Sequence, residues 1–243
     1  MRCVRFVILA IACVVCVHAQ EHDSEVTQSL RLNRAANGTD GTLQVLTDSR
    51  LSSELQKQMW GVGDWSFVLP EDDARRAEFE HNPPKNAQLR IVSDTGVVLR
   101  NVSLEQPLAK VTEAHLGNGK TSFFVAVDYS IGFGSYAGIT TLLLDVVGGQ
   151  FQWTQATSVD TQGSEQIRLP NTLKTAWKLV PFHGKQDILL TFCRPAKVQV
   201  PGREFVVGYV RYRFDGKRWL KYERVRNGFW ESDEAFPPLS SFP

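Results

Sequence analysis

The spacing of apolar residues changes along the chain from a helical pattern to one typical of strands. In the first part, Leu51, Leu55 and Met59 recur every four residues, which predicts a short helix over residues 51–60. A second helix is expected directly after Pro70. The three acidic residues that follow Pro70 would lie in its first turn, where the helix dipole is positive.

From residue 88 onward, β-branched and aromatic residues alternate with polar ones between glycine turns, as strands require. A hairpin is expected over residues 88–93 and 97–103. Two sets of four predicted strands follow: residues 110–116, 122–129, 139–147 and 150–156, then residues 176–182, 187–192, 205–214 and 218–225. The predicted fold is all-β, mostly antiparallel four-stranded meanders that close as a sandwich or a partial propeller, with one or two short helices near the N-terminus.

The two sets of strands can be superimposed on each other. The Gly-Lys pair at residues 119–120 falls on the pair at residues 184–185, and Trp153 falls close to Trp219. The alternative is that glycine turns recur at this spacing by chance. The predicted organisation is a single β-rich domain over residues 41–243 with internal repeats at 110–156 and 176–226.

A repeated four-stranded meander resembles a β-propeller blade, and the turn Gly117-Asn118-Gly119-Lys120 is similar to the turn of FG-GAP-like repeats. Those repeats carry several acidic calcium ligands in the turn, where this chain has Asn118 alone. The resemblance therefore does not imply calcium binding here. The units are also too few for a closed ring, which typically has about four to eight blades.

The N-terminal residues follow the order of an export signal. Arg2 and Arg5 precede an apolar run of about a dozen residues, which is shorter than the roughly 20 of a membrane span, and Ala19 suits cleavage. Residues 1–19 are therefore predicted to be a cleavable signal peptide, with an uncleaved anchor as the alternative. The expected location is periplasmic, cell-envelope or extracellular. Residues 20–40 are polar and are predicted to form a flexible tether.

The charge of the chain bears on its possible partners, and its cysteine content bears on the role of Cys193. The chain has 27 basic and 26 acidic residues, so its overall charge favours neither nucleic acid nor an acidic membrane surface. Three of the four cysteines lie in the predicted signal peptide, and the fourth, Cys193, lies in an apolar strand. Cys193 is expected to be a buried apolar residue rather than a reactive thiol.

The motifs of common enzymes do not fit this chain. The glycine-rich segment 132–138 lacks the spacing of a nucleophile elbow or a dinucleotide fingerprint, and is expected to be a flexible connection. His115 and His183 occupy neighbouring places in the two repeats, but neither has an evident acidic partner, so no metal or cofactor is predicted. A pair of catalytic carboxylates is defined by distance in space, which the sequence does not supply.

The hairpin over residues 205–226 combines strand alternation with positive charge. Tyr209, Arg211 and Arg213 share one face, because side chains alternate along a strand. A two-residue turn at Asp215 and Gly216 would add Arg218, Leu220, Tyr222 and Arg224 to that face, and a three-residue loop would add Lys217, Trp219, Lys221 and Glu223. The candidate ligand-binding residues are therefore Tyr209, Arg211, Arg213, Arg218, Trp219 and Lys221. The alternative is a solvated face with Glu223 as a local counter-charge.

These patterns leave three functional hypotheses. The leading one is an exported, non-catalytic binding module for an anionic polysaccharide or the acidic surface of a protein partner. The second is a secreted hydrolase of polysaccharide or peptide, with carboxylates assembled by the fold. The third is a structural subunit that completes its sheets with a second chain.

Overall fold

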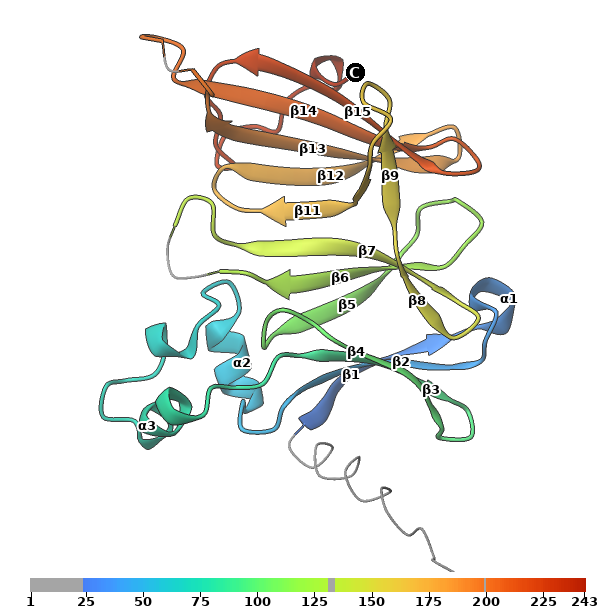
Figure 1. Ribbon diagram of the computed structural model, residues 1–243, viewed down its shortest axis with the longest axis vertical. Coiled ribbons are helices and arrows are strands. Elements are labelled where there is room, and N and C mark those ends of the chain that lie inside the picture. Colours follow the sequence, from blue (N-terminus) through green and yellow to red (C-terminus); the bar gives the residue numbers. More distant parts are fainter. Residues whose placement is uncertain (1–23, 131–133, 199) are drawn as a thin grey trace, which may run out of the picture.

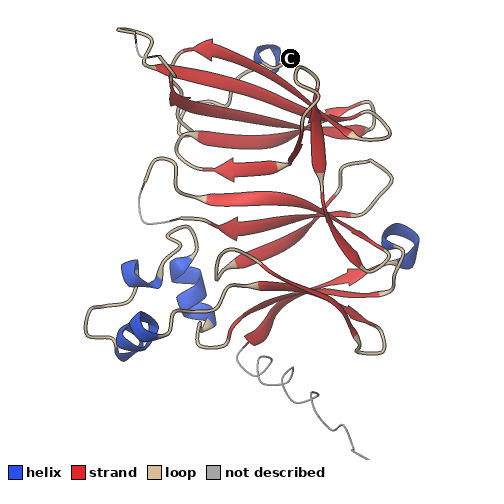
Figure 2. Cartoon of the chain, viewed as in Figure 1, coloured by secondary structure: helices blue, strands red, loops and turns tan. Residues whose placement is uncertain are grey.

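The computed structural model describes residues 24–130, 134–198 and 200–243, and in them the chain forms three stacked β-sheets (Figures 1 and 2). Strands make up 49% of the structure and helices 12%, and the sheets do not close into a barrel, which confirms the predicted all-β class with few helices. The predicted signal peptide, residues 1–19, lies outside the described residues.

The first sheet has four antiparallel strands in chain order, at the lower end of the molecule in Figure 1. They are β1 (Ser24–Leu32), β2 (Gly41–Asp48), β3 (Gln88–Ser93) and β4 (Val98–Ser103). The predicted hairpin is β3 and β4, and β4 begins one residue later than expected. The other two strands come from the segment before the helices.

The prediction of a tether over residues 20–40 is wrong for residues 24–40. β1 pairs with β2 along nearly its whole length, and a short helix, α1 (Arg34–Asn37), follows it. The polar residues of β1 alternate with Leu30 and Leu32, and Leu32 is 1% exposed in the core. An edge strand with one face exposed to solvent needs few apolar residues. The alternation of apolar and polar residues in its sequence is therefore weak.

The side chain of Asn37 attaches α1 to the central sheet. Its amide nitrogen donates to the carbonyl oxygens of Thr121 at 3.2 Å and Val146 at 3.3 Å, and Asn37 is 1% exposed. We expect Asn37→Ala to lower the free energy of unfolding by about 1–3 kcal/mol, because it leaves buried carbonyl groups unsatisfied. Urea denaturation measures this difference. The exposed Asn86→Ala is the matched control, and an equal loss in both variants would contradict the assignment.

The central sheet contains the first predicted meander and one later strand. Its strands are β5 (Ala109–Ala114), β6 (Ser122–Asp128), β7 (Ile139–Val147), β8 (Gln150–Trp153) and β11 (Arg168–Asn171). β8 and β11 pair with different halves of the same edge of β7. The third sheet contains the second predicted meander in the order β10-β9-β15-β14-β13-β12. Its strands are β9 (Gln155–Ser158), β10 (Ser164–Gln166), β12 (Thr175–Phe182), β13 (Lys185–Pro195), β14 (Phe205–Phe214) and β15 (Trp219–Asn227).

Each face of the central sheet packs against a neighbouring sheet. Phe123 and Val125 pack in one apolar cluster with residues of the first sheet, such as Ile91. Phe124 belongs to a second cluster with residues of the third sheet, such as Val210. The molecule is thus a three-layer stack. The long apolar run of the central strands follows from burial on both sides.

The predicted strand over residues 150–156 is in fact two strands in different sheets. β8 pairs with β7 in the central sheet, and β9 pairs in parallel with β15 in the third sheet. Thr154 stands between them and is 8% exposed. A strand that bends from one sheet into another forms a corner of a β-sandwich. This corner positions the groove described below.

The expected helices form a small lobe beside the first two sheets, at the lower left of Figure 1. α2 (Ser53–Met59) matches the predicted helix, and Leu51, Leu55 and Met59 are all buried. α3 (Ala74–His81) begins later than predicted. The acidic residues 71–73 precede its first turn, and Asp73 accepts a hydrogen bond from the backbone N–H of Arg75 as the N-cap.

A short 3₁₀ helix, η2 (Trp65–Phe67), connects α2 and α3 within this lobe, and a second, η3 (Leu239–Ser241), lies near the C-terminus. No helix in the described ranges is long and apolar enough to cross a membrane.

The outer edge of the central sheet is covered locally by a side chain of the first sheet. The backbone N–H of Val111 in β5 donates to Gln28 Oε1 at 2.8 Å, and Gln28 Nε2 donates to the carbonyl oxygen of Val111. The side-chain amide therefore makes the two bonds that a neighbouring strand would make. Gln28 lies next to a register shift in β1, which turns its side chain toward β5.

Candidate functional site

The loop between β14 and β15 differs from both predicted registers. Phe214 pairs with Trp219, so the loop has four residues, 215–218. Arg213 lies opposite Leu220 and Arg211 opposite Tyr222, which places them on the outer face of the third sheet. This arrangement separates the six predicted ligand-binding residues, which do not form one surface.

Tyr209, Arg211 and Arg213 share the outer face, as predicted. Arg213 forms a bidentate pair with the buried Asp187, with Nη2 at 2.7 Å from Oδ2, and its guanidinium lies 3.4 Å from the centre of the Phe182 ring. Arg211 Nε lies 3.8 Å from the same carboxylate oxygen and has no hydrogen-bond partner, although the atom is buried. Burial and the charge of Arg213 lower the pKa of Arg211.

The C-terminal segment crosses this outer face. The ring of Phe242 packs edge-on against Tyr209 at 5.6 Å, and Phe236 lies 4.3 Å from the ammonium of Lys178. Arg224 Nη1 donates to the carbonyl oxygen of Ser241 at 3.4 Å. Part of the surface predicted to bind a ligand is therefore occupied by the chain itself. Cys193 is buried on this same sheet, as its sequence context indicates.

Trp219 and Lys221 point to the opposite side of the sheet. Trp219 is 4% exposed and belongs to the core between the central and third sheets. Lys221 Nζ lies 2.8 Å from Glu165 and 2.9 Å from Glu223. Burial lowers the pKa of Lys221, but the hydrogen bonds to these two carboxylates outweigh it and raise the pKa. The charge of Lys221 is thus neutralised within the fold.

Arg218 lines a groove at the end of the central and third sheets, which we call the turn groove, and the buried Trp219 forms part of its wall. It is a hollow with a cavity volume of about 220 Å3, and it is open to solvent. The β5–β6 turn supplies Asn118 and Lys120, the β8–β9 corner supplies Thr154, and the loop after β14 supplies Lys217. Figure 1 shows these turns together at the right-hand side of the molecule.

Two of the turns that the repeat aligns also touch each other beside the groove. The backbone N–H of Gln186 donates to the carbonyl oxygen of Leu116 at 3.0 Å. A Cβ added to Gly117 would lie 2.5 Å from the carbonyl oxygen of Gly184, so only glycine fits there. Glycine-lysine pairs at residues 119–120, 184–185 and 216–217 are thereby brought to one end of the molecule.

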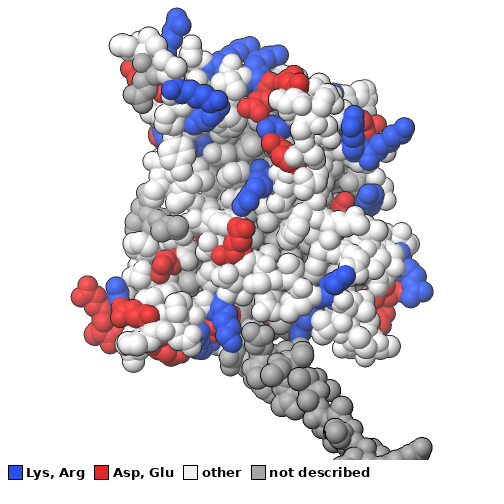
Figure 3. Space-filling model, in the orientation of Figure 1, with Lys and Arg blue, Asp and Glu red and all other residues white. Residues whose placement is uncertain are grey.

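The turn groove carries an excess of positive charge. Lys120 and Lys217 have no ion-pair partner among the described residues, and Arg218 has only Asp215, at 4.0 Å. The one carboxylate that lines the groove is Asp145, which accepts a hydrogen bond from Ser122 at 2.6 Å. Figure 3 shows Lys and Arg side chains at the right-hand edge of the upper half, where these turns lie.

The wall of the groove contains a buried polar atom without a partner. Thr154 Oγ1 has no hydrogen bond within the described chain, although Thr154 is 8% exposed. A buried hydroxyl that lacks a partner is costly, and such groups are rare in folded proteins. Thr154 is among the residues that line the groove, although this oxygen itself is closed to solvent.

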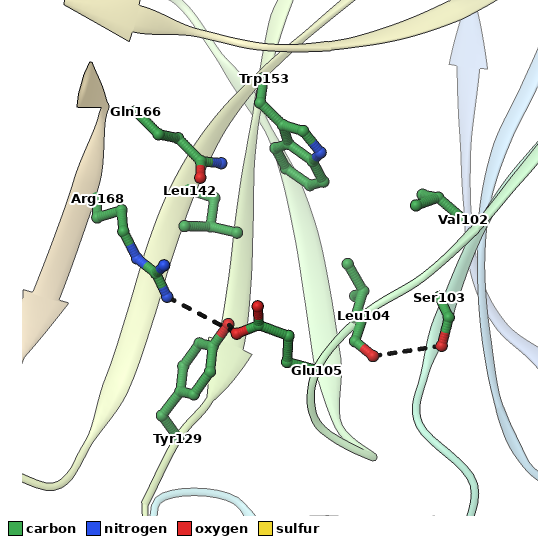
Figure 4. A pocket seen from close by; sticks show the side chains of 9 residues that line it. All are labelled: Val102, Ser103, Leu104, Glu105, Tyr129, Leu142, Trp153, Gln166 and Arg168. Carbon is green, nitrogen blue, oxygen red and sulfur yellow. Dashed lines mark hydrogen bonds and ion pairs between the residues drawn. The ribbon is translucent and has the colours of Figure 1, made fainter. Parts of the chain in front are cut away.

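A second hollow, which we call the interlayer pocket, lies between the first and central sheets (Figure 4). Glu105 and Arg168 lie 3.9 Å apart on one side of it, and the hydroxyl of Tyr129 donates to Glu105 at 2.6 Å. Burial, reinforced by the hydrogen bond to Glu105, raises the pKa of Tyr129 to about 12. Trp153 lines both the interlayer pocket and the turn groove.

Metal ligation has no evident site in the described parts of the chain. No group of three or more His, Cys, Asp or Glu side chains is placed there to hold a metal ion. His115 and His183 are both exposed, and His115 lies 3.6 Å from Glu113.

Sequence reasoning missed the turn groove because its residues come from turns far apart along the chain. The signal that could have found it is the repeated glycine-lysine pair, which was used only to align the repeats. Comparison of the chain with known protein families, with curated proteins and with solved structures found no match.

Proposed function

We propose that this chain is an exported binding module for an acidic polysaccharide, and that the ligand binds in the turn groove. The excess of cations in the groove supports this proposal most strongly: Lys120, Lys217 and Arg218 lie there with a single carboxylate. Such a site attracts carboxylate or sulfate groups, and arginine binds them with a planar pair of donors.

The aromatic and amide side chains of the groove support the proposal that the anionic ligand is a sugar. Phe214 and Trp153 are half-buried and are among the residues that line the groove. Gln152, Gln155 and Asn118 provide amide groups that can donate to and accept from hydroxyl groups. Apolar rings with a few polar groups are typical of a ligand site.

The first test is the double variant Lys217→Ala, Arg218→Ala. We expect it to weaken binding of polygalacturonate or heparin by about tenfold at low ionic strength, because each lost charge contributes on the order of 0.5–1 kcal/mol at an exposed site. The difference should shrink at high salt, which screens exposed charges. Isothermal titration calorimetry at two salt concentrations measures both effects.

A matched control removes the same charge elsewhere. Lys197 and Arg203 are exposed on the loop between β13 and β14, and their double alanine variant should bind as the parent protein does. The variant Arg211→Ala, Arg213→Ala tests the outer face. If only this last variant loses binding, or if the parent protein binds neither polymer, the assignment to the turn groove is wrong.

A further inference from the structure

The interlayer pocket differs in chemistry from the turn groove. It holds one carboxylate, from Glu105, and one guanidinium, from Arg168, so its charges balance. The two groups are 3.9 Å apart, which is an ion pair but not a hydrogen bond. A pocket with this composition does not select a ligand by net charge.

The polar groups of the pocket keep much of their hydrogen-bonding capacity. Within the described chain, the side chain of Gln166 makes no hydrogen bond, Arg168 interacts with Glu105 at 3.9 Å and with Tyr129, and Glu105 uses only Oε2, which accepts from Tyr129. Figure 4 shows Gln166, Arg168 and Glu105 along one side of the pocket. Each ends in a planar group with two neighbouring polar atoms, which can bind two adjacent hydroxyl groups at once.

The rest of the pocket lining is largely apolar. Leu142 is 6% exposed and Leu104 is also 6% exposed, and the indole of Trp153 stands above them in Figure 4. The hollow has a cavity volume of about 120 Å3, below the range typical of sites for drug-sized ligands, so it suits only a small group. An aromatic side chain next to planar polar groups is suited to a ligand ring that has an apolar face and polar groups at its edges.

We propose that the interlayer pocket binds one uncharged sugar ring. The C–H face of a pyranose would stack on Trp153, while its adjacent hydroxyl groups would bond with Glu105, Arg168 and Gln166. This inference does not depend on the proposed function, because it concerns a different hollow and a neutral ligand. Trp153 is left unchanged in the tests, since it lines both hollows.

The test uses a panel of neutral hexasaccharides: cellohexaose, laminarihexaose, mannohexaose, xylohexaose and chitohexaose. We expect the parent protein to bind at least one of them, measured by calorimetry and by chemical-shift changes of the tryptophan indole N–H groups. Gln166→Ala and Arg168→Ala should each weaken that binding by about tenfold. Glu105→Gln keeps the size of the side chain and should weaken it while folding is retained.

Three controls separate this proposal from the other one. Gln58→Ala and Arg203→Ala change exposed residues of the same types and should leave neutral-sugar binding unchanged. Lys217→Ala, Arg218→Ala should also leave it unchanged, although it weakens binding of the acidic polymers. Thermal unfolding of every variant checks that it is folded. The proposal is overturned if no hexasaccharide binds to the parent protein, or if binding is equal in the folded pocket variants.

Discussion

Replacing Phe123 by alanine is expected to lower the free energy of unfolding by about 3–5 kcal/mol, the cost of deleting a buried aromatic ring. Phe123 is 1% exposed and packs in the apolar cluster between the first and central sheets. The loss combines the transfer of apolar surface to water with the cavity left behind. Guanidinium denaturation measures it directly.

The control for this prediction is Phe229→Ala, because Phe229 is 51% exposed on the surface. It should cost less than half as much as Phe123→Ala. A loss below about 1.5 kcal/mol for Phe123→Ala would contradict the three-layer arrangement, since an aromatic ring enclosed between two sheets leaves a large cavity.

Replacing Asp187 by alanine is expected to cost about 3 kcal/mol, the lower end of the cost of breaking a buried ion pair. Asp187 is 2% exposed and is the carboxylate that neutralises Arg211 and Arg213 on the outer face. Without it, two neighbouring guanidinium groups remain with their charges unbalanced. Urea denaturation at low salt measures the effect.

A second substitution tests the cause of that loss. Arg211→Leu in the Asp187→Ala background should restore part of the stability, because it removes the repulsion between Arg211 and Arg213. A double-mutant cycle gives the interaction energy. If Asp187→Ala costs under about 1 kcal/mol, or if Arg211→Leu adds to the loss, the cluster is not held by its charges.

The sequence predicted the strands that carry clear apolar runs. β3, β7 and β14 match their predicted ranges, because their apolar residues lie between clear glycine turns. The polar strand β1 was missed, because a solvent-exposed edge strand shows little alternation of apolar and polar residues. The corner at Thr154 was missed for another reason: the pattern continues through it while the pairing changes from one sheet to another.

The candidate site was predicted only in part. Alternation along β14 correctly placed Arg211 and Arg213 on one face. It carried no information on Asp187, which lies in the neighbouring strand, or on the C-terminal segment, which packs over that face. Arg218 and Trp219 lie in the turn groove because their loop has four residues, and the local sequence pattern does not predict this length.

The bonds between Gln28 and Val111 bear on self-association. An edge strand with free backbone groups is a template for another strand, and proteins that leave such edges open are prone to aggregate. Here one glutamine side chain occupies the backbone groups in the middle of β5 and interrupts the row that an incoming strand would need. One residue of the first sheet thus removes two backbone groups of the central sheet from those with which an incoming strand could pair.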